Sequence, residues 1–215
     1  MEIDVIEAVI WDFGGVFTTS PFEAFARYER ERGIPVGVIR KINSTNHENN
    51  AWARFERSAL DFAGFDEAFA AEARLLGFEI PGREVLPLLA GEFRPEMIEA
   101  LRRIKSRFKT GCITNNMPAD AAGIAATSRS IYAREIMELF DAVIESSKAG
   151  IRKPDPRIYT MMCELLGVAP DACVYVDDLG GNLKPARAMG MTTIKVESGA
   201  QAIAELEAAT GMKLS

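Results

Sequence analysis

The residues best suited to chemistry lie where apolar, strand-like runs of the sequence come to an end. The run AVIW is followed by Asp12, and the run CVYV is followed by Asp177 and Asp178. A third run, which ends in CITN, supplies Thr114 and Asn115. Because ligand sites in open parallel sheets lie beyond the carboxyl ends of the strands, we expect these side chains to meet at one edge of a sheet.

One lysine completes this set. Lys153 stands in the stretch RKPDPRIY, in a turn just before a predicted helix. Taken singly, Asp12 could shape a turn, Lys153 could be a solvated cation, and Asp177 with Asp178 could cap the helix that follows them. Taken together, these carboxylates form an acidic cluster that a divalent cation would neutralise. Oxygen ligands with few or no histidines favour Mg²⁺ over zinc or copper.

The glycines that follow the first aspartate point to a phosphoryl group. Gly14 and Gly15 would let backbone N–H groups approach its oxygens. Mg²⁺ and Lys153 would offset the repulsion between the Asp12 carboxylate and the phosphate. Asp12 can then act as a nucleophile, forming an aspartyl phosphate that water later opens.

Short β-rich runs alternate with helical periodicity along the chain, which predicts an α/β fold with a parallel sheet covered on both faces. The predicted strands are EAVIWD, KTGCITN, FDAVIES, DACVYVD and MTTIKVE. A helix is predicted after Pro95, with Met97, Leu101, Ile104 and Phe108 on its apolar face. Further helices are predicted over residues 156–166, 182–189 and 200–209, the first of them capped by Gly167.

Residues 18–92 have a different character. Phenylalanines recur among helix formers, and β-branched runs are missing. This stretch is far longer than an ordinary connection between a strand and a helix. We therefore predict a helical cap subdomain over residues 18–92, inserted into a catalytic core formed by residues 1–17 and 93–215.

Composition narrows the class of partner. The chain has 215 residues, of which 48% are hydrophobic and 26% charged, as in globular proteins. Its formal net charge of -6 argues against nucleic acid as the main partner. No apolar run approaches the roughly 20 residues of a membrane span, and the N-terminus lacks the basic start of a secretory signal. We therefore expect a cytoplasmic protein without a membrane partner, whose cysteines, Cys112, Cys163 and Cys173, are reduced core residues.

Four segments carry a family resemblance. WDFGGVF, CITNN, RKPDPRIY and VYVDDLGGNLKPARAMGM, in this order, resemble the four motifs of the haloacid dehalogenase superfamily of aspartate-nucleophile hydrolases. The likeness is greatest to the branch that contains the N-terminal phosphatase domain of soluble epoxide hydrolase, and it extends over nearly the whole chain. It implies a Rossmann-like core with a helical cap inserted after the first motif.

The resemblance also implies roles for individual residues. Asp12 corresponds to the nucleophile, and Lys153 stabilises charge. Thr114 and Asn115 hold the phosphoryl oxygens. The substrate implied by these roles is a small phosphorylated metabolite.

The implied magnesium site consists of Asp12, the backbone carbonyl of Gly14, and Asp178 assisted by Asp177. At Gly14 the sequence departs from the family pattern. Most phosphatases of this superfamily carry a second aspartate two residues after the nucleophile, which serves as general acid and then as base. That side chain is absent here, and positioned acid–base catalysis is typically worth about 10² to 10⁴-fold.

Three interpretations remain open at this stage. The first is a phosphatase restricted to good leaving groups, such as acyl or sugar-1 phosphates, or one that uses another acid or water. The second is a 2-haloacid dehalogenase, which also lacks the second aspartate; such relatives use no metal, and the pair Asp177 and Asp178 counts against this interpretation. Phosphonate hydrolysis is a lesser variant that would need a cap lysine, for which Lys41 is the only candidate. The third is a non-catalytic protein that binds a phosphate ligand.

Two conspicuous residues receive no catalytic role. His47, the only histidine, lies in the polar run NSTNHENN and is expected to be solvated or to cap a helix. Trp11 neighbours Asp12, but alternate residues of a strand face opposite sides, so Trp11 is expected to lie in the core. The sequence does not decide between a monomer and a homodimer.

Overall fold

The computed structural model describes residues 6–89, 91–116 and 128–214. Within these residues a single parallel sheet has the strand order β3-β2-β1-β4-β5. Its strands are β1 (Ala8–Trp11), β2 (Lys109–Thr114), β3 (Ala142–Glu145), β4 (Cys173–Asp177) and β5 (Thr192–Lys195). The predicted strands and the α/β class are confirmed. Because β1 pairs with both β2 and β4, the chain order reverses beside β1, where open sheets place their ligand sites.

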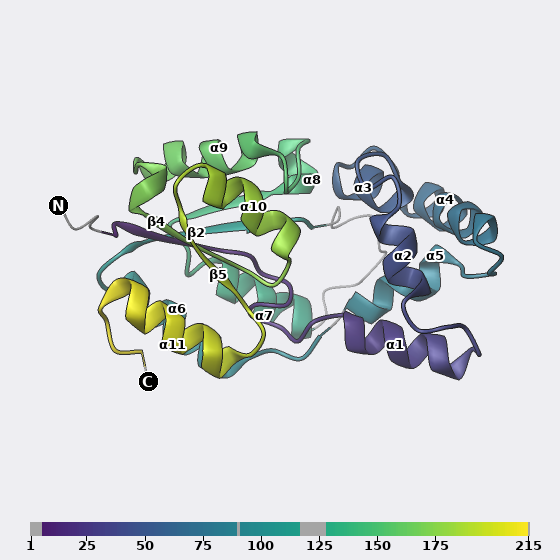
Figure 1. Ribbon diagram of the computed structural model, residues 1–215, viewed down its shortest axis with the longest axis horizontal. Coiled ribbons are helices and arrows are strands. Elements are labelled where there is room, and N and C mark those ends of the chain that lie inside the picture. The colour runs from purple at the N-terminus through teal and green to yellow at the C-terminus, as the bar shows by residue number, and fades with distance from the viewer. Residues whose placement is uncertain (1–5, 90, 117–127, 215) are drawn as a thin grey trace.

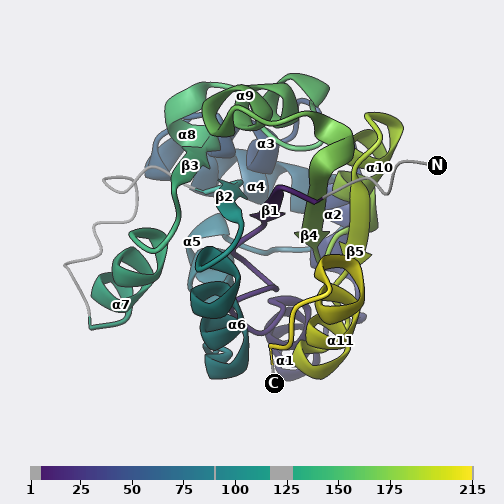
Figure 2. The same ribbon diagram turned by 90° about the vertical axis from the view of Figure 1, so that its left-hand side faces the viewer.

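Helices cover both faces of this sheet (Figure 1). Helices α6 (Pro95–Lys105) and α11 (Gly199–Thr210) pack on one face, together with the end of α7 (Ser128–Met137). Helices α9 (Pro156–Leu166) and α10 (Gly180–Ala188) pack on the other face. Figure 2 shows α9 on one side of the strands and α6 and α11 on the opposite side. Side chains of β1 alternate between the two faces of the sheet. Val9 and Trp11 pack in one core cluster, and Ala8 and Ile10 pack in the other.

The core helices begin and end close to their predicted bounds. Helix α9 starts at Pro156 and ends at Leu166, and the next residue, Gly167, has a φ of 62°, the left-handed conformation of a helix cap. Helix α10 begins two residues earlier than predicted, at Gly180 rather than Asn182. The reason lies in the preceding turn, where the Asp177 carboxylate accepts a hydrogen bond from the N–H of Leu179 (2.8 Å) and starts the helix at once.

Residues 18–92, hereafter the helical segment, form a second group of helices beside the carboxyl edge of the sheet (Figure 1). They pack around their own buried cluster, which includes Phe55, Phe65 and Phe69. The elements are α1 (Phe22–Glu31), α2 (Val38–Ser44), α3 (Ala51–Glu56), α4 (Phe62–Leu75), α5 (Gly82–Val85) and a 3₁₀ turn, η1 (Leu86–Leu89). Helix α8 (Ser146–Ala149), which follows β3, makes contacts with α3.

The helical segment leaves and rejoins the core at one place. Thr18 and Phe93 form an antiparallel bridge. The N–H of Thr19 donates to the Glu92 carbonyl and the N–H of Arg94 to the Phe17 carbonyl, both at 2.8 Å. These contacts lie at the predicted junctions, but the division into a core of 1–17 and 93–215 and a cap of 18–92 stays a prediction. Residues 1–5, 117–127 and 215 of that core lie outside the described residues.

Two further expectations concern the chain as a whole. All three cysteines are buried and free, as predicted for core thiols. Among the residues that the structure describes, no helix combines the length and apolar character needed to cross a bilayer.

Candidate active site

The sheet brings two of the predicted aspartates side by side. Asp12 directly follows β1, and its N–H donates to the Val176 carbonyl of β4 at 2.8 Å. That pairing aligns Asp12 with Asp177, the last residue of β4. Asp178 follows at once, and carboxylate oxygens of Asp12, Asp177 and Asp178 all lie within 4.8 Å of one another. The sequence-predicted acidic cluster is thus assembled at the carboxyl edge of the sheet.

Lys153 lies between two of these carboxylates. Its Nζ is 2.8 Å from Asp12 Oδ1 and 2.9 Å from Asp177 Oδ2. Its side chain is only 1% exposed, so the ammonium group has left bulk water and depends on these anions for its stability. The lysine predicted from RKPDPRIY is therefore part of the same site.

Asp177 is held more tightly than the other two aspartates. Its oxygens accept hydrogen bonds from the Tyr175 hydroxyl (2.6 Å), the Leu179 N–H (2.8 Å) and Asn182 Nδ2 (3.1 and 3.2 Å), besides the contact with Lys153. A carboxylate has about four acceptor positions, and these donors occupy them. This favours a positioning role for Asp177 and leaves Asp12 and Asp178 as the more available oxygen donors.

The charges at this edge are strongly coupled. Burial raises the pKa of Asp12 to about 8, with Asp177 and Asp178 adding to the rise and Lys153 opposing it. Burial and the neighbouring Asp177 likewise raise the pKa of Asp178 to about 6. Burial alone would lower the pKa of Lys153, but the Asp12 and Asp177 carboxylates outweigh it and raise that pKa. One lysine cannot balance three ionised carboxylates, so a bound cation would stabilise their charged forms.

The two glycines of this loop have different surroundings. Gly15 is buried with a φ of +74°, and a Cβ at this position would collide with the carboxylate of Asp178. A side chain at Gly15 would therefore displace an aspartate of the cluster. Gly14 is exposed, and a Cβ there would meet nothing within 4 Å. The site needs a glycine at position 15 for its geometry, whereas position 14 has room for a side chain.

The end of β2 supplies the remaining predicted residues. Thr114, its last residue, is buried. Both polar groups of the Asn115 side chain bind the backbone of Lys153: Nδ2 donates to its carbonyl (3.0 Å), and Oδ1 accepts from its N–H (2.9 Å). The N–H of Gly15 donates to the Thr18 hydroxyl at 3.2 Å. The contact of Thr114, Asn115 and Gly15 with a phosphoryl group stays a prediction, and Asn115 also fixes the loop that carries Lys153.

Several residues of this network were not predicted from the sequence. Tyr175 lies two positions before Asp177 in β4, so strand alternation alone could have placed both on one face. Asn182 lies in the first turn of α10, where a side chain can face the preceding strand end. Glu56 and Arg152 form a buried ion pair next to Lys153, and no local pattern in the sequence signals that pair.

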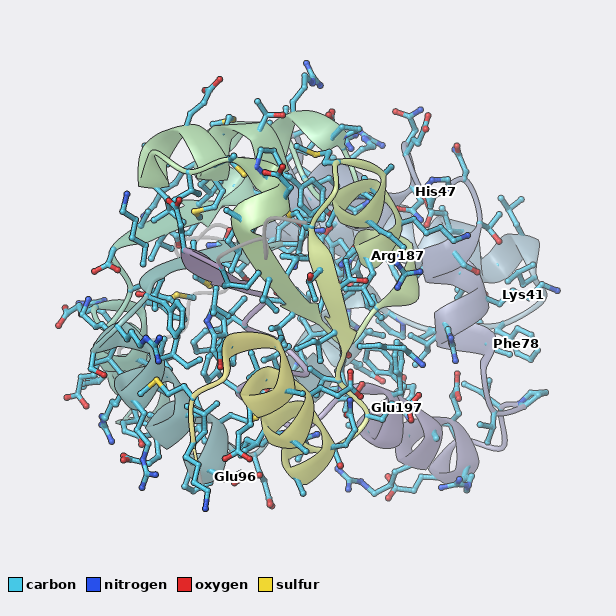
Figure 3. The ribbon with its side chains drawn as sticks, turned by 60° about the vertical axis from the view of Figure 1, so that its left-hand side comes forward. Lys41, His47, Phe78, Glu96, Arg187 and Glu197 are labelled. Atoms are coloured by element: carbon cyan, nitrogen blue, oxygen red, sulfur yellow. The ribbon has the colours of Figure 1, made fainter. Side chains whose placement is uncertain are left out.

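Residues without a predicted catalytic role lie elsewhere. Trp11 is fully buried in the core cluster, as expected from strand alternation. His47 and Lys41 are both exposed side chains of the helical segment (Figure 3). The solvated position expected for His47 is confirmed.

Comparisons with known proteins identify the family of this chain. Residues 6–190 match the family model described as haloacid dehalogenase-like hydrolase. The chain is 34% identical over 209 residues to the phosphatase MT3486 of Mycobacterium tuberculosis (strain CDC 1551 / Oshkosh), covering 91% of this chain and 89% of that protein. It is 30% identical over 221 residues to the bifunctional epoxide hydrolase 2 of Sus scrofa. That match covers 97% of this chain but 40% of the pig protein, so the chain spans less than half of that relative.

Solved structures share the fold at low sequence identity. A HAD family enzyme of Bacteroides thetaiotaomicron, in complex with magnesium and inorganic phosphate, has a TM-score of 0.59 at 16% identity, with 90% of this chain and 96% of that chain covered. An L-2-haloacid dehalogenase of Xanthobacter autotrophicus, with chloropropionic acid covalently bound, has a TM-score of 0.61 at 21% identity, with 95% and 83% covered. The same fold thus occurs in an enzyme that binds magnesium and phosphate and in a dehalogenase. The fold alone therefore does not decide between a phosphatase and a dehalogenase.

Proposed function

Because this chain belongs to the haloacid dehalogenase-like hydrolase family, we propose that it is a Mg²⁺-dependent phosphatase that uses Asp12 as its nucleophile. The substrate is a small phosphorylated metabolite. The observation that carries the proposal is the contact of Asp12 with Lys153 inside a cluster of three carboxylates. The relative named a phosphatase, which is 34% identical, supports the same activity.

The residues at the sheet edge fit a magnesium ion. The donors are carboxylates that lie within 4.8 Å of one another, and burial raises the pKa of both Asp12 and Asp178. A cation would offset that cost, and donors that are all oxygen suit Mg²⁺. Asp12, Asp178 and the Gly14 carbonyl would hold the ion. Asp177 would orient the side chains that it contacts. The bound ion would supply positive charge to the phosphoryl oxygens.

Asp12 has one oxygen held by the protein. Its Oδ1 accepts from the Phe13 N–H (2.6 Å) and contacts Lys153 Nζ (2.8 Å). We therefore assign the attack on phosphorus to Oδ2. The new bond joins Oδ2 to phosphorus, and the bond from phosphorus to the leaving-group oxygen breaks with its electron pair on that oxygen. Water then attacks the phosphorus of the aspartyl phosphate, and the bond from phosphorus to Oδ2 breaks with its electron pair on Oδ2. The attacking water gives up a proton to solvent, which releases inorganic phosphate and restores the Asp12 carboxylate.

Three further groups would stabilise the transferred phosphoryl group. Thr114 and Asn115 would donate to its oxygens, and Lys153 would offset its charge. No carboxyl group stands at Gly14 to protonate the leaving group. The substrate should therefore leave readily without a protein acid, as acyl and sugar-1 phosphates do, or take its proton from water.

The helical segment acts in this proposal as a cap of residues 18–92 on a core of 1–17 and 93–215. It lies beside the carboxyl edge of the sheet, where closure would exclude bulk water and protect the aspartyl phosphate (Figure 1). Its contacts with the core include a hydrogen bond from the Ser58 hydroxyl to the Ser147 carbonyl at 2.8 Å. Substrate choice would then depend on side chains of this segment.

Two other functions are less well supported. A 2-haloacid dehalogenase would need no metal, and the assembled pair of Asp177 and Asp178 favours the phosphatase. A non-catalytic phosphate-binding protein would not require Asp12, Thr114 and Lys153 all to be present around the cluster, as they are here.

One assay separates these functions. Hydrolysis of p-nitrophenyl phosphate and acetyl phosphate is measured with Mg²⁺ and with EDTA, alongside halide release from 2-chloropropionate without metal. We expect phosphate release that EDTA abolishes and Mg²⁺ restores. Asp12→Asn, which keeps the shape of the side chain, should lower that rate by at least about 10³-fold. Halide release without metal would establish a dehalogenase function. Retained phosphatase activity in Asp12→Asn would refute the assignment of Asp12 as the nucleophile.

A further inference from the structure

A buried ion pair joins the helical segment to the residue just before Lys153. Arg152 Nε lies 2.5 Å from Glu56 Oε2, and the two side chains are 18% and 8% exposed. Glu56 is the last residue of α3, whereas Arg152 belongs to the turn that leads into α9. The two atoms are in ion-pair contact without the alignment of a hydrogen bond.

Both partners make further contacts, some of them across the same boundary. Arg152 also donates from a guanidinium nitrogen to the His47 carbonyl at 2.9 Å. The Glu56 carbonyl accepts from the Ser146 hydroxyl at 2.8 Å, and its carboxylate accepts from Trp52 Nε1 at 3.0 Å. Arg152 therefore binds the helical segment at two points, and Glu56 is anchored through both its backbone and its side chain.

The same short turn is fixed from the opposite side by the sheet. The Lys153 backbone forms two hydrogen bonds with the Asn115 side chain, and its Nζ reaches Asp12 and Asp177. Burial raises the pKa of Glu56, whereas Arg152 and Lys153 both act to lower it, so the Glu56 carboxylate and the Lys153 ammonium affect each other electrostatically. Residues 152 and 153 thus connect the helical segment to the proposed nucleophile.

Stability alone does not explain this pair. Moving two charges out of water can cost more than their attraction returns, and apolar residues of similar volume are often as stable. A buried pair does, however, specify one arrangement of the elements that carry its partners. Here those elements are α3 of the helical segment and the Lys153 turn.

We propose that Glu56 and Arg152 are positioning residues that hold Lys153 against Asp12 when the helical segment is seated on the sheet edge. The pair acts through Lys153 and has no contact with the reacting atoms. The position of the helical segment on the sheet edge thereby affects how well Lys153 stabilises charge at Asp12. This inference rests on the proposed phosphatase function and identifies two residues that govern its rate.

The test compares Glu56→Gln, Arg152→Met and the double variant in Mg²⁺-dependent hydrolysis of p-nitrophenyl phosphate. Each single variant should lower kcat by at least about tenfold with KM changed by less than about threefold, because displacing a charge by a fraction of an ångström slows the step without removing a substrate contact. The double variant should lose about as much as either single variant, because the residues act as one unit. Arg152→Lys, which keeps the charge, should recover part of the loss.

The matched control is Arg157→Met, which removes an exposed arginine four positions after Lys153 that pairs with Asp155. Its kcat should stay within about twofold of the wild type. Circular dichroism and urea unfolding establish that every variant is folded under assay conditions. An unchanged kcat in the folded single variants, a loss equal to the unfolded fraction, or a rise in KM at constant kcat would each overturn the positioning role.

Trp52 supplies a readout that does not need turnover, because its indole N–H binds Glu56. Inorganic phosphate with Mg²⁺ should change the Trp52 fluorescence of the wild type and not that of Arg152→Met, with Trp52→Phe identifying the signal. A wild type that hydrolyses no phosphate ester or acyl phosphate but shows this difference would refute the proposed function and retain the coupling. An equal change, or none, in both proteins would overturn the coupling.

Discussion

The carboxyl edge of the sheet and the helical segment bury different kinds of side chain. At the edge, the ionisable side chains of Asp12, Asp177 and Lys153 are buried, and each has polar partners. In the helical segment the interior is apolar, with aliphatic side chains around packed rings such as those of Phe55 and Phe65, whose centroids lie 4.7 Å apart. The edge is held by directional contacts that permit one arrangement, whereas the aromatic cluster is held by contacts that tolerate adjustment.

This difference separates two tasks. Polar groups held in fixed positions suit chemistry that must be the same for every substrate. An apolar cluster that can change its packing suits a cap, whose surface determines which molecules enter. Glu29 and Glu56 are buried carboxylates of the helical segment, and Glu56 pairs with Arg152 beside the edge. Among the residues that the structure describes, this ion pair links the two regions.

Of the variants that compare the two regions, Lys153→Met at the edge should have the largest combined effect on stability and rate. Removal of the ammonium would leave Asp12 and Asp177 buried without their shared cation. We expect the free energy of unfolding to fall by about 3–5 kcal/mol and the rate to fall by at least about 100-fold. Urea unfolding and kcat measure the two effects.

The control for this variant is Lys148→Met, because the Lys148 side chain is 78% exposed and pairs with Glu145. It should change the free energy of unfolding by no more than about 0.5 kcal/mol. A Lys153→Met protein within about 1 kcal/mol of the wild type would show that the edge is not held by its charges.

A different result is expected when the helical segment is altered by Phe65→Ala. Phe65 is fully buried and its ring lies 4.7 Å from Phe55, 5.4 Å from Trp52 and 5.5 Å from Phe69. Its truncation should cost about 3–5 kcal/mol of unfolding free energy. The rate with acetyl phosphate, a substrate that needs little from a cap, should stay within about threefold while the protein is folded.

Leu75→Ala is the matched control, because Leu75 lies on the same helix and is 85% exposed. It should alter stability by no more than about 0.5 kcal/mol. If folded Phe65→Ala lost activity as completely as Lys153→Met, the aromatic cluster would belong to the site, and the separation of tasks would be wrong.

Much of the edge could be predicted from the sequence because its residues are placed by strand ends. Asp12, Thr114 and Asp177 follow or end apolar runs, and parallel pairing brings such positions together whatever the rest of the chain does. Lys153 was found through its motif. Helix bounds set by proline and glycine, as in α9, were also predictable.

Contacts between distant segments were not predictable. Glu56 and Arg152 lie in unrelated stretches and meet only because the helical segment seats on the sheet edge. Neither has a neighbour in the sequence that distinguishes it from a surface charge. The separate surroundings of Gly14 and Gly15 were equally hidden, since only the structure shows that Asp178 packs against the second glycine.

The smallest effect is expected at Gly14, where the edge is open to solvent. Gly14 has an ordinary backbone conformation, and the space that a Cβ would occupy there is free, so Gly14→Asp should fold without strain. A carboxyl group there could protonate a leaving group. We expect kcat/KM for a simple alkyl phosphate such as glycerol phosphate to rise by about tenfold or more, while p-nitrophenyl phosphate, whose leaving group needs no proton, changes by less than about threefold.

Gly14→Ala separates the carboxyl group from the mere presence of a side chain, since it adds the Cβ alone. It should leave both substrates unchanged, because nothing lies within 4 Å of that atom. An equal gain on both substrates would mean that the new charge acts on the whole cluster rather than on the leaving group. No gain on either would mean that proton transfer to the leaving group does not limit the rate, and that Gly14 is not what restricts the enzyme to good leaving groups.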